Sequence, residues 1–279
     1  MRAHIGHSKG DLSHRTATFS DDAYDEWRDE SLREQFETSF PEQSLAGKRV
    51  LDFGCGSGQL CSFVRKKGAR SVIGSDLSKK QIDLALEREA RERIGCQYFL
   101  ETDPKRISLP DNSLDVILCF DVMEHVMDYR EAMQEWMRVL APGGSVLIWW
   151  SVWWHPYGHH LHTMIPLPWI HAFMSDASML RVCARIYDTP HFQPRLWHFD
   201  ENGQRKPNPY AGKQQFDDLN KLTISGFDKT AAAAGFKTKR KDVNPFTGAT
   251  FAGLKKALAH SPWPDFFCSC VVYELKKPA

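Results

Sequence analysis

The residues best suited to bind a ligand lie in one short stretch, Val50 to Leu60, which reads VLDFGCGSGQL. An apolar run leads into Asp52 and is followed by glycines at positions 54, 56 and 58. Glycine permits a tight turn and lets a ligand approach main-chain N–H groups at the start of a helix. Asp76 ends the next apolar run, where a carboxylate can accept both hydroxyl hydrogens of a ribose. The pattern predicts a site for a ligand that carries a ribose.

Two other interpretations of this turn have to be weighed. A glycine-rich turn by itself can be purely structural. Here strand, turn, helix, second strand and acid follow one another in the order that a binding site needs, which favours ligand binding. A nicotinamide dinucleotide fold would carry G-x-G-x-x-G, whereas this chain has G-x-G-x-G preceded by an acid. The spacing therefore argues against a pyrophosphate.

The elements that would position these residues alternate between short apolar runs and amphipathic stretches, which is typical of an α/β fold. The predicted helices are Gln59–Lys67, a helix capped by Ser78 that ends near Gly95, and Tyr129–Leu140. The predicted strands are Arg49–Phe53, Ser71–Ser75, Cys96–Leu100, Leu114–Phe120 and Ser145–Trp150, with a break at Ala141–Gly144. The fifth strand is apolar on both faces, as in the middle of a parallel sheet. After residue 225 the pattern resumes with a helix in SGFDKTAAAAGF and strands in KTKRKDV and FFCSCVVYEL.

Residues 151–225 interrupt this alternation with dense Pro, Trp and His and one predicted helix, IHAFMSDASMLRVCARIYD. In open α/β sheets the loops at the carboxyl ends of strands line the ligand crevice, so this insertion is expected to form a substrate lid. The predicted organisation is a polar tail and helical cap in 1–48, a core in 49–150, the lid in 151–225, and the rest of the sheet in 226–279.

Composition excludes several classes of function. Lys and Arg number 36 against 35 acidic residues, and this net charge of +1 provides no general field for nucleic acid. No apolar run approaches the roughly 20 residues that span a bilayer, and the polar N-terminus lacks the apolar stretch that is typical of a signal peptide. The seven scattered cysteines lack zinc-site spacing and indicate reduced thiols. We expect a cytoplasmic protein with a small-molecule partner, without nucleic-acid binding or membrane insertion.

The motif Asp-Phe-Gly-Cys-Gly-Ser-Gly resembles the first motif of the class I S-adenosylmethionine-dependent methyltransferases. DNSLDVILCFDVMEHV and RVLAPGGSVLI are similar to the fourth-strand and fifth-strand motifs of the subgroup with ubiquinone-type and natural-product methyltransferases. The resemblance covers residues 49 to 150. It implies a Rossmann-like sheet of seven strands, mostly parallel with the last antiparallel, and S-adenosylmethionine across the ends of the first two strands.

The resemblance also implies which residues border the cofactor. Asp52 and the glycines would border the methionine portion, Asp76 would hold the ribose, and Asp103 would approach the adenine amino group. Tyr24 and Trp27, from a helix before the first strand, would cover the cofactor, although ordinary helix packing explains them equally well. The full predicted cofactor set is Asp52, Phe53, Gly54, Cys55, Gly56, Gly58, Asp76, Leu77, Asp103, Pro104, Phe120, Asp121, Tyr24 and Trp27.

The candidates for catalysis are histidines. A hydroxyl acceptor needs a base to take its proton, and histidine suits that role near neutral pH, whereas an amine or carboxylate needs no strong base. The candidates are His125, His155 and His159. His125 lies in a dipeptide that the resemblance associates more with structure or cofactor orientation than with base catalysis.

The predicted substrate-binding residues combine aromatic surface with polar groups, as binding pockets do. They are Trp153, Trp154, Tyr157, His160, Arg195 and Trp197. Core packing explains the tryptophans equally well, and a surface salt bridge is the plainer explanation of Arg195. No acid or cysteine completes a metal site in the histidine cluster, so no metal is predicted.

The sequence therefore predicts methyl transfer from S-adenosylmethionine to a small molecule, with O-methylation favoured. The alternatives are N-methylation of a small amine and a catalytically inert binding module that keeps the fold.

Overall fold

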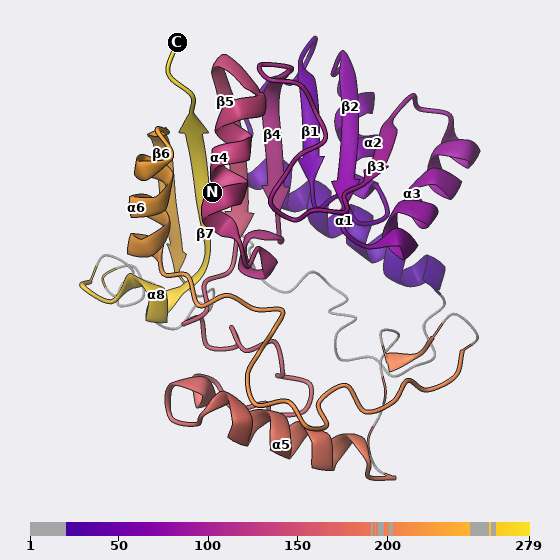
Figure 1. Ribbon diagram of the computed structural model, residues 1–279, viewed down its shortest axis with the longest axis vertical. Coiled ribbons are helices and arrows are strands. Elements are labelled where there is room, and N and C mark those ends of the chain that lie inside the picture. The colour runs from indigo at the N-terminus through magenta and orange to yellow at the C-terminus, as the bar shows by residue number, and fades with distance from the viewer. Residues whose placement is uncertain are drawn as a thin grey trace.

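The structure, a computed structural model, describes residues 21–190, 192, 194, 198–200, 203–245, 257 and 261–279. It contains a seven-stranded sheet in the order β3-β2-β1-β4-β5-β7-β6 (Figure 1). The strands are β1 (Arg49–Phe53), β2 (Ser71–Asp76), β3 (Gln97–Leu100), β4 (Leu114–Phe120), β5 (Leu140–Trp150), β6 (Lys237–Pro245) and β7 (Cys268–Lys276). The predicted fold class is confirmed: β1 to β5 pair in parallel, and β7 runs antiparallel to both β5 and β6.

Helices cover both faces of the sheet. They are α1 (Asp21–Ser39), α2 (Gln59–Lys66), α3 (Lys79–Glu92), α4 (Tyr129–Val139), α5 (Asp176–Tyr187), α6 (Ile224–Ala233) and α8 (Pro264–Phe267), with 3-10 turns η2 (Met123–His125) and η3 (Ile170–Ala172). Strand β4 contributes to the hydrophobic core on each face of the sheet, because successive side chains of a strand point to opposite faces. Ile117 packs in the core with α4 and α6, and the adjacent Leu118 packs in the core with α1, α2 and α3.

The insertion forms a third layer beyond the ends of the parallel strands (Figure 1). It has a hydrophobic cluster of its own, which includes Trp153, Met179, Leu180, Tyr187 and Leu219. The side chain of Ser175 accepts a hydrogen bond from the Ser178 amide and caps α5. The helix is therefore shorter than the predicted stretch that starts at Ile170.

Two other boundaries differ from prediction. The expected break at Ala141–Gly144 lies within β5, where the pairing with β4 shifts register between Leu114 and Val116. Gly143, at φ +74°, allows the local excursion that the shift requires. Phe266 and Phe267, predicted as strand, belong to α8, which has Pro264 in its first turn.

An ion pair joins the start of β1 to β4. The two carboxylate oxygens of Asp115 accept hydrogen bonds from the Arg49 main-chain N–H and from its guanidinium, at 2.8 Å each. The Arg49 hydrogen bond holds the pKa of Asp115 below its ordinary value of 3.8, although partial burial opposes the shift. The stabilisation is present above that ordinary value and is lost as the pH falls through the lowered pKa.

We predict that Asp115→Asn lowers the free energy of unfolding at pH 7 by about 1 kcal/mol, a value that allows for solvent screening of a partly exposed pair. Urea unfolding at several pH values measures it, and the difference from wild type should shrink towards pH 3. Asp83→Asn is the control, because Asp83 forms an exposed pair with Lys79 one helical turn away. An equal loss in both variants would contradict the prediction.

Candidate active site

A cleft of about 980 Å³ lies at the carboxyl ends of the parallel strands. It borders the point where the strand order reverses between β1 and β4, which is where open α/β sheets bind ligands. Its lining includes eight of the predicted cofactor residues: Phe53, Gly54, Gly56, Asp76, Leu77, Asp103, Pro104 and Asp121. Residues predicted from three separate motifs therefore meet in one cavity.

The glycine turn packs closely on its neighbours and leaves free space on its cleft side. A Cβ at Gly54 would lie 2.6 Å from Val122, and one at Gly58 would lie 2.5 Å from the Tyr98 hydroxyl, so these two glycines let the turn pack closely on its neighbours. A Cβ at Gly56 would meet no protein atom closer than 3.8 Å, and Gly56 lines the cleft. The absent side chain at Gly56 leaves room on the ligand side of the turn.

Asp76 lies at the end of β2 and faces this turn. Its Oδ2 accepts a hydrogen bond from the Gly56 amide at 3.0 Å, and its Oδ1 accepts one from the Ser78 amide at 2.8 Å. A carboxylate has about four acceptor positions, so two remain for the hydroxyls of a ribose. Asp76 and Gly56 therefore fit S-adenosylmethionine, with the carboxylate placed for its sugar.

Other predicted cofactor residues lie behind the cleft. Asp52 is 3% exposed and accepts a hydrogen bond from the Cys61 thiol, and burial raises its pKa to about 7. Cys55 is buried beside it, and Gly58 caps α2. Phe120 packs against Phe36 and Phe40 of the α1 end in the core. These buried residues support the residues that line the cleft.

Helix α1 contributes a residue that the sequence did not single out. Arg28 lines the cleft, and its guanidinium lies 2.7 Å from the Asp121 carboxylate. Burial acts to raise the pKa of Asp121, but the charge and hydrogen bond of Arg28 outweigh it and hold that pKa low. Trp27 is half-buried and is not among the cleft residues, and the side chain of Tyr24 lies outside the described part.

The carboxyl of Glu124 behaves in the opposite way. Glu124 is 4% exposed, and burial together with the charge of Asp121 raises its pKa well above the usual range. The pKa values of the two neighbouring carboxyls are thus shifted in opposite directions, which reduces the repulsion between them.

The predicted histidines separate in the structure. His125, in η2, lines the cleft, and the ring of His160 packs against it with centroids 5.3 Å apart. His159 is fully buried, and its Nδ1 accepts a hydrogen bond from the Leu161 amide. His155 accepts one from the Tyr157 amide. Burial, followed by neighbouring histidines, lowers the pKa of His155, His159 and His160 to about 4, so all three are neutral at pH 7.

The aromatic residues of the insertion mostly pack on each other. Trp153 is buried between His171 and Phe216, and Trp154 stacks on Phe266 of α8 with centroids 5.0 Å apart. Tyr157 is partly exposed and is not among the cleft residues. Arg195 and Trp197 lie outside the described residues.

The insertion reaches the cleft instead through Phe199 and Lys206, which sequence reasoning missed. Both belong to a narrow loop in which Phe199 bridges to Arg205. The Arg205 guanidinium lies 4.1 Å from the centre of the Tyr187 ring, and the Tyr187 hydroxyl donates to the Lys206 carbonyl at 2.7 Å. Helix α5 thus holds this loop in place at the cleft.

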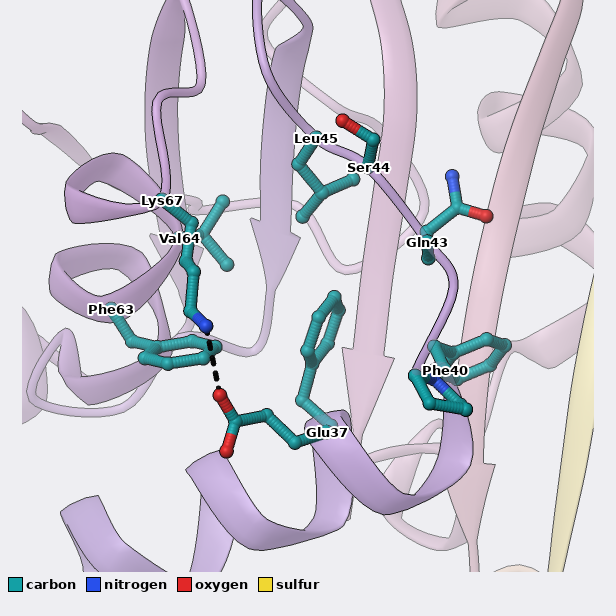
Figure 2. Close-up of a pocket in the computed structure, with 10 residues that line it drawn as sticks. Glu37, Phe40, Gln43, Ser44, Leu45, Phe63, Val64 and Lys67 are labelled. Carbon is teal, nitrogen blue, oxygen red and sulfur yellow. Dashed lines mark hydrogen bonds and ion pairs between the residues drawn. The ribbon is translucent and has the colours of Figure 1, made fainter.

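A second hollow, of about 410 Å³, lies between the end of α1 and α2 (Figure 2). Phe40, Phe63 and Val64 form apolar walls, and an ion pair between Glu37 and Lys67, at 2.9 Å, spans its rim. It shares no lining residue with the cleft. Besides that ion pair its polar lining side chains are Gln43 and Ser44, and none of the predicted site residues lines it, so the larger cleft is the candidate active site.

Within the described ranges, no three His, Cys, Asp or Glu side chains group closely enough to hold a metal ion. No helix in the part of the chain that was searched is both long and apolar enough to cross a bilayer.

Comparisons with known proteins agree with this geometry. A family model described as "Methyltransferase domain" matches residues 51–148. The ubiquinone biosynthesis O-methyltransferase of Aeromonas salmonicida (strain A449) is 33% identical over 104 residues, which cover 37% of this chain and 43% of that protein. Phosphoethanolamine N-methyltransferase 1 of Zea mays is 37% identical over 105 residues, which cover 37% of this chain and 20% of the relative. The match spans less than half the length of these curated relatives.

Solved structures extend the likeness of fold to most of the chain. An S-adenosylmethionine dependent methyltransferase from Mesorhizobium loti aligns with a TM-score of 0.51 and 20% identity, over 91% of this chain and 99% of that one. The [4+2]-cyclase SpnF aligns with a TM-score of 0.53 and 15% identity, over 95% of this chain and 87% of that one. At these identities the likeness concerns the fold alone.

The fold and cleft are those of a Rossmann-like domain in which residues 51–148 match a methyltransferase domain. The chain is similar in this part to S-adenosylmethionine-dependent methyltransferases, and this similarity implies S-adenosylmethionine as the cofactor.

We predict that Asp76→Ala weakens binding of S-adenosylhomocysteine by about 10- to 100-fold, because it removes a charged acceptor of hydrogen bonds. Isothermal titration calorimetry measures the dissociation constant. Asp83→Ala, an exposed carboxylate of α3, is the control and should bind as the wild type does. Unchanged affinity of Asp76→Ala would remove Asp76 from the cofactor site.

Proposed function

We propose that this chain transfers the methyl group of S-adenosylmethionine to a hydroxyl of a small molecule, with His125 as the general base. The observation that carries the proposal is that His125 lines the same cleft as Gly56 and Asp76, the residues that fit the cofactor. The favoured O-methylation rests on the presence of this base.

The proton on His125 can be assigned from its contact. Its Nδ1 lies 2.7 Å from the main-chain carbonyl oxygen of Asp218. A carbonyl can only accept a hydrogen bond, so Nδ1 carries the hydrogen. In the neutral ring the lone pair is then on Nε2, and this nitrogen is the one that can take a proton from a hydroxyl.

When bound, S-adenosylmethionine supplies a methyl group on a sulfonium, a leaving group that needs no protonation. The chain's own residues then have to position the reactants and exclude water. Asp76 holds the sugar, and the pair of Arg28 with Asp121 joins α1 to the end of β4 over the cleft. Phe199 and Lys206 close the cleft from the insertion.

N-methylation of a small amine is the second candidate, and Asp121 favours it. This charged carboxylate faces the cleft, and an ammonium group could pair with it. A phosphoethanolamine N-methyltransferase is among the relatives. An amine needs no strong base, so the two candidates differ in their need for His125.

The reaction can be tested with S-adenosylmethionine that carries an isotopically labelled methyl group. The purified chain is incubated with panels of phenols, aliphatic alcohols and amines, and mass spectrometry detects labelled products, whose NMR shifts separate O-methyl from N-methyl groups. Labelled ethers support the proposal and labelled amines support the second candidate. Tight binding of S-adenosylhomocysteine without any product from small-molecule extracts would indicate an inert binding module.

We predict that His125→Gln lowers kcat for a hydroxyl acceptor by about 10²- to 10⁴-fold, the usual contribution of a general base. S-adenosylhomocysteine affinity, measured by calorimetry on the same variant, should stay at the wild-type value. Wild-type turnover of a hydroxyl acceptor by this variant would exclude His125 as the base.

A further inference from the structure

The last residues of the insertion, Asp218 to Leu222, join two hydrophobic cores. Leu219 is 5% exposed and packs in the cluster of the insertion. Leu222 is also 5% exposed, and it packs in the core that α4 and α6 form on the sheet. Because the two leucines are buried in different hydrophobic cores, the short segment between them is anchored at both ends.

Asn220 lies between these leucines and is 8% exposed. Its Nδ2 donates to the carbonyl oxygens of Met123, at 2.7 Å, and Val126, at 2.9 Å. Its Oδ1 accepts a hydrogen bond from the Leu222 amide at 3.1 Å. Carbonyl oxygens cannot donate, so the amide orientation of Asn220 has no alternative. One side chain thus satisfies both ends of the turn that contains His125.

Main-chain contacts add to this junction. The Asn220 amide donates to the Glu124 carbonyl at 2.8 Å. Two residues earlier, the Asp218 carbonyl accepts the Nδ1 hydrogen of His125. The insertion therefore makes four hydrogen bonds to the segment Met123–Val126, and one of them is to the imidazole itself.

We propose that Asn220 is a positioning residue that holds the His125 turn against the insertion, so that the Asp218 carbonyl sets the tautomer of His125. Asn220 acts through His125 and does not touch the reactants. The inference rests on the proposed function in one respect, the role of Nε2 as the base. The tautomer itself can be measured without any acceptor.

The charges around His125 are compatible with this role. The ring of His160 packs on His125, the main chain of Asp218 contacts it, and Asp121, Glu124 and Arg28 lie close to one another near the same turn. The pKa of His160 is lowered to about 4 by burial, the pKa of Glu124 is raised by burial, and Arg28 pairs with Asp121. The hydrogen bond to Asp218 is then the specific interaction that distinguishes the two nitrogens of His125 within the described part of the chain.

The first measurement uses the wild-type chain. Nitrogen-15 labelling of histidine and NMR at pH 7 to 8 report the tautomer of each ring, and His125→Gln identifies the His125 signals by their loss. We expect His125 to be predominantly the Nδ1–H form. A predominantly Nε2–H ring, or an equal mixture, overturns the proposal whatever the variants do.

The second measurement uses Asn220→Asp. This variant keeps the shape and the acceptor for Leu222, but it places carboxylate oxygens against the carbonyls of Met123 and Val126. The main-chain bond from residue 220 to Glu124 remains and favours folding. We expect the ratio of Nδ1–H to Nε2–H at His125 to fall about 5-fold or more, which corresponds to losing one net hydrogen bond.

Asn208→Asp is the matched control. Asn208 also belongs to the insertion, and its Nδ2 donates to the Ala184 carbonyl at 2.9 Å, but it contacts α5 and not η2. The control should leave the His125 tautomer unchanged. An equal change in both variants would mean that any loosening of the insertion disturbs His125, and it would overturn the specific role of Asn220. Asn220→Ala, which lacks the repulsive oxygens, replaces Asn220→Asp if that variant does not fold.

Kinetics separate this proposal from the proposed function. With a hydroxyl acceptor, Asn220→Asp should lower kcat about 10-fold while KM stays within about 2-fold, because the base is misplaced and binding is not. A tautomer change without any methyl transfer by the wild type would leave Asn220 as a positioning residue and reject the proposed function. An unchanged tautomer alongside normal wild-type turnover would reject the role of Asn220 alone.

Discussion

The site depends on one carboxylate that joins three elements. Asp76 ends β2, accepts the Gly56 amide of the turn after β1, and accepts the Ser78 amide just before α3. The Ser75 carbonyl next to it accepts the amides of Gly54 and Cys55. These bonds satisfy main-chain donors that would otherwise need water, and they fix the turn while it remains open towards the cleft. The two amides also fix the orientation of the Asp76 carboxylate, whose remaining acceptor positions are then free for the hydroxyls of a sugar.

The acceptor side is built differently, from segments far apart in the sequence. Arg28 comes from α1, His125 from η2, and Phe199 and Lys206 from the insertion. What brings them together is packing between cores, together with the contacts of Asp218 and Asn220 at the junction. The insertion is therefore a wall of the cleft, and the same contacts that place it also hold the turn that contains His125.

The difference between the local cofactor turn and the cleft wall built from distant segments explains which residues could be predicted from the sequence. Strand Leu114–Phe120 and the Ser78 cap were predicted to the residue, because apolar periodicity and capping are local signals. The glycine turn and Asp76 could be predicted from the sequence for the same reason. Arg28 was not, because its partner Asp121 is 93 residues away and no local pattern links them.

The histidine cluster also shows that sequence spacing alone could not predict which residues form a common site. HPYGHHLH places four imidazoles close together in sequence, yet His159 is buried in the insertion while His160 packs on His125. Adjacent residues in an irregular segment can point in unrelated directions, so their spacing does not define a common site. The cleft residues Phe199 and Lys206 were missed because a polar loop has no periodicity that indicates which side chain faces inward.

The backbone conformation of Asp121 is a further feature of the cleft. Five described residues other than glycine have positive φ, and Asn112 and Arg93 among them follow from a turn and a helix end. Trp169 precedes the 3-10 turn η3, and His160, at φ 55°, closes a turn in which its amide donates to the Tyr157 carbonyl. Asp121, at φ 59°, directly follows β4. Each of these residues carries a cost of about 1 to 3 kcal/mol that surrounding packing has to offset. Asp121 pairs with Arg28 at the cleft, and His160 packs on the proposed base. At the cleft, positive φ thus occurs at Asp121, where the surrounding contacts have to offset its cost, and at Gly54 and Gly56, where glycine makes it inexpensive.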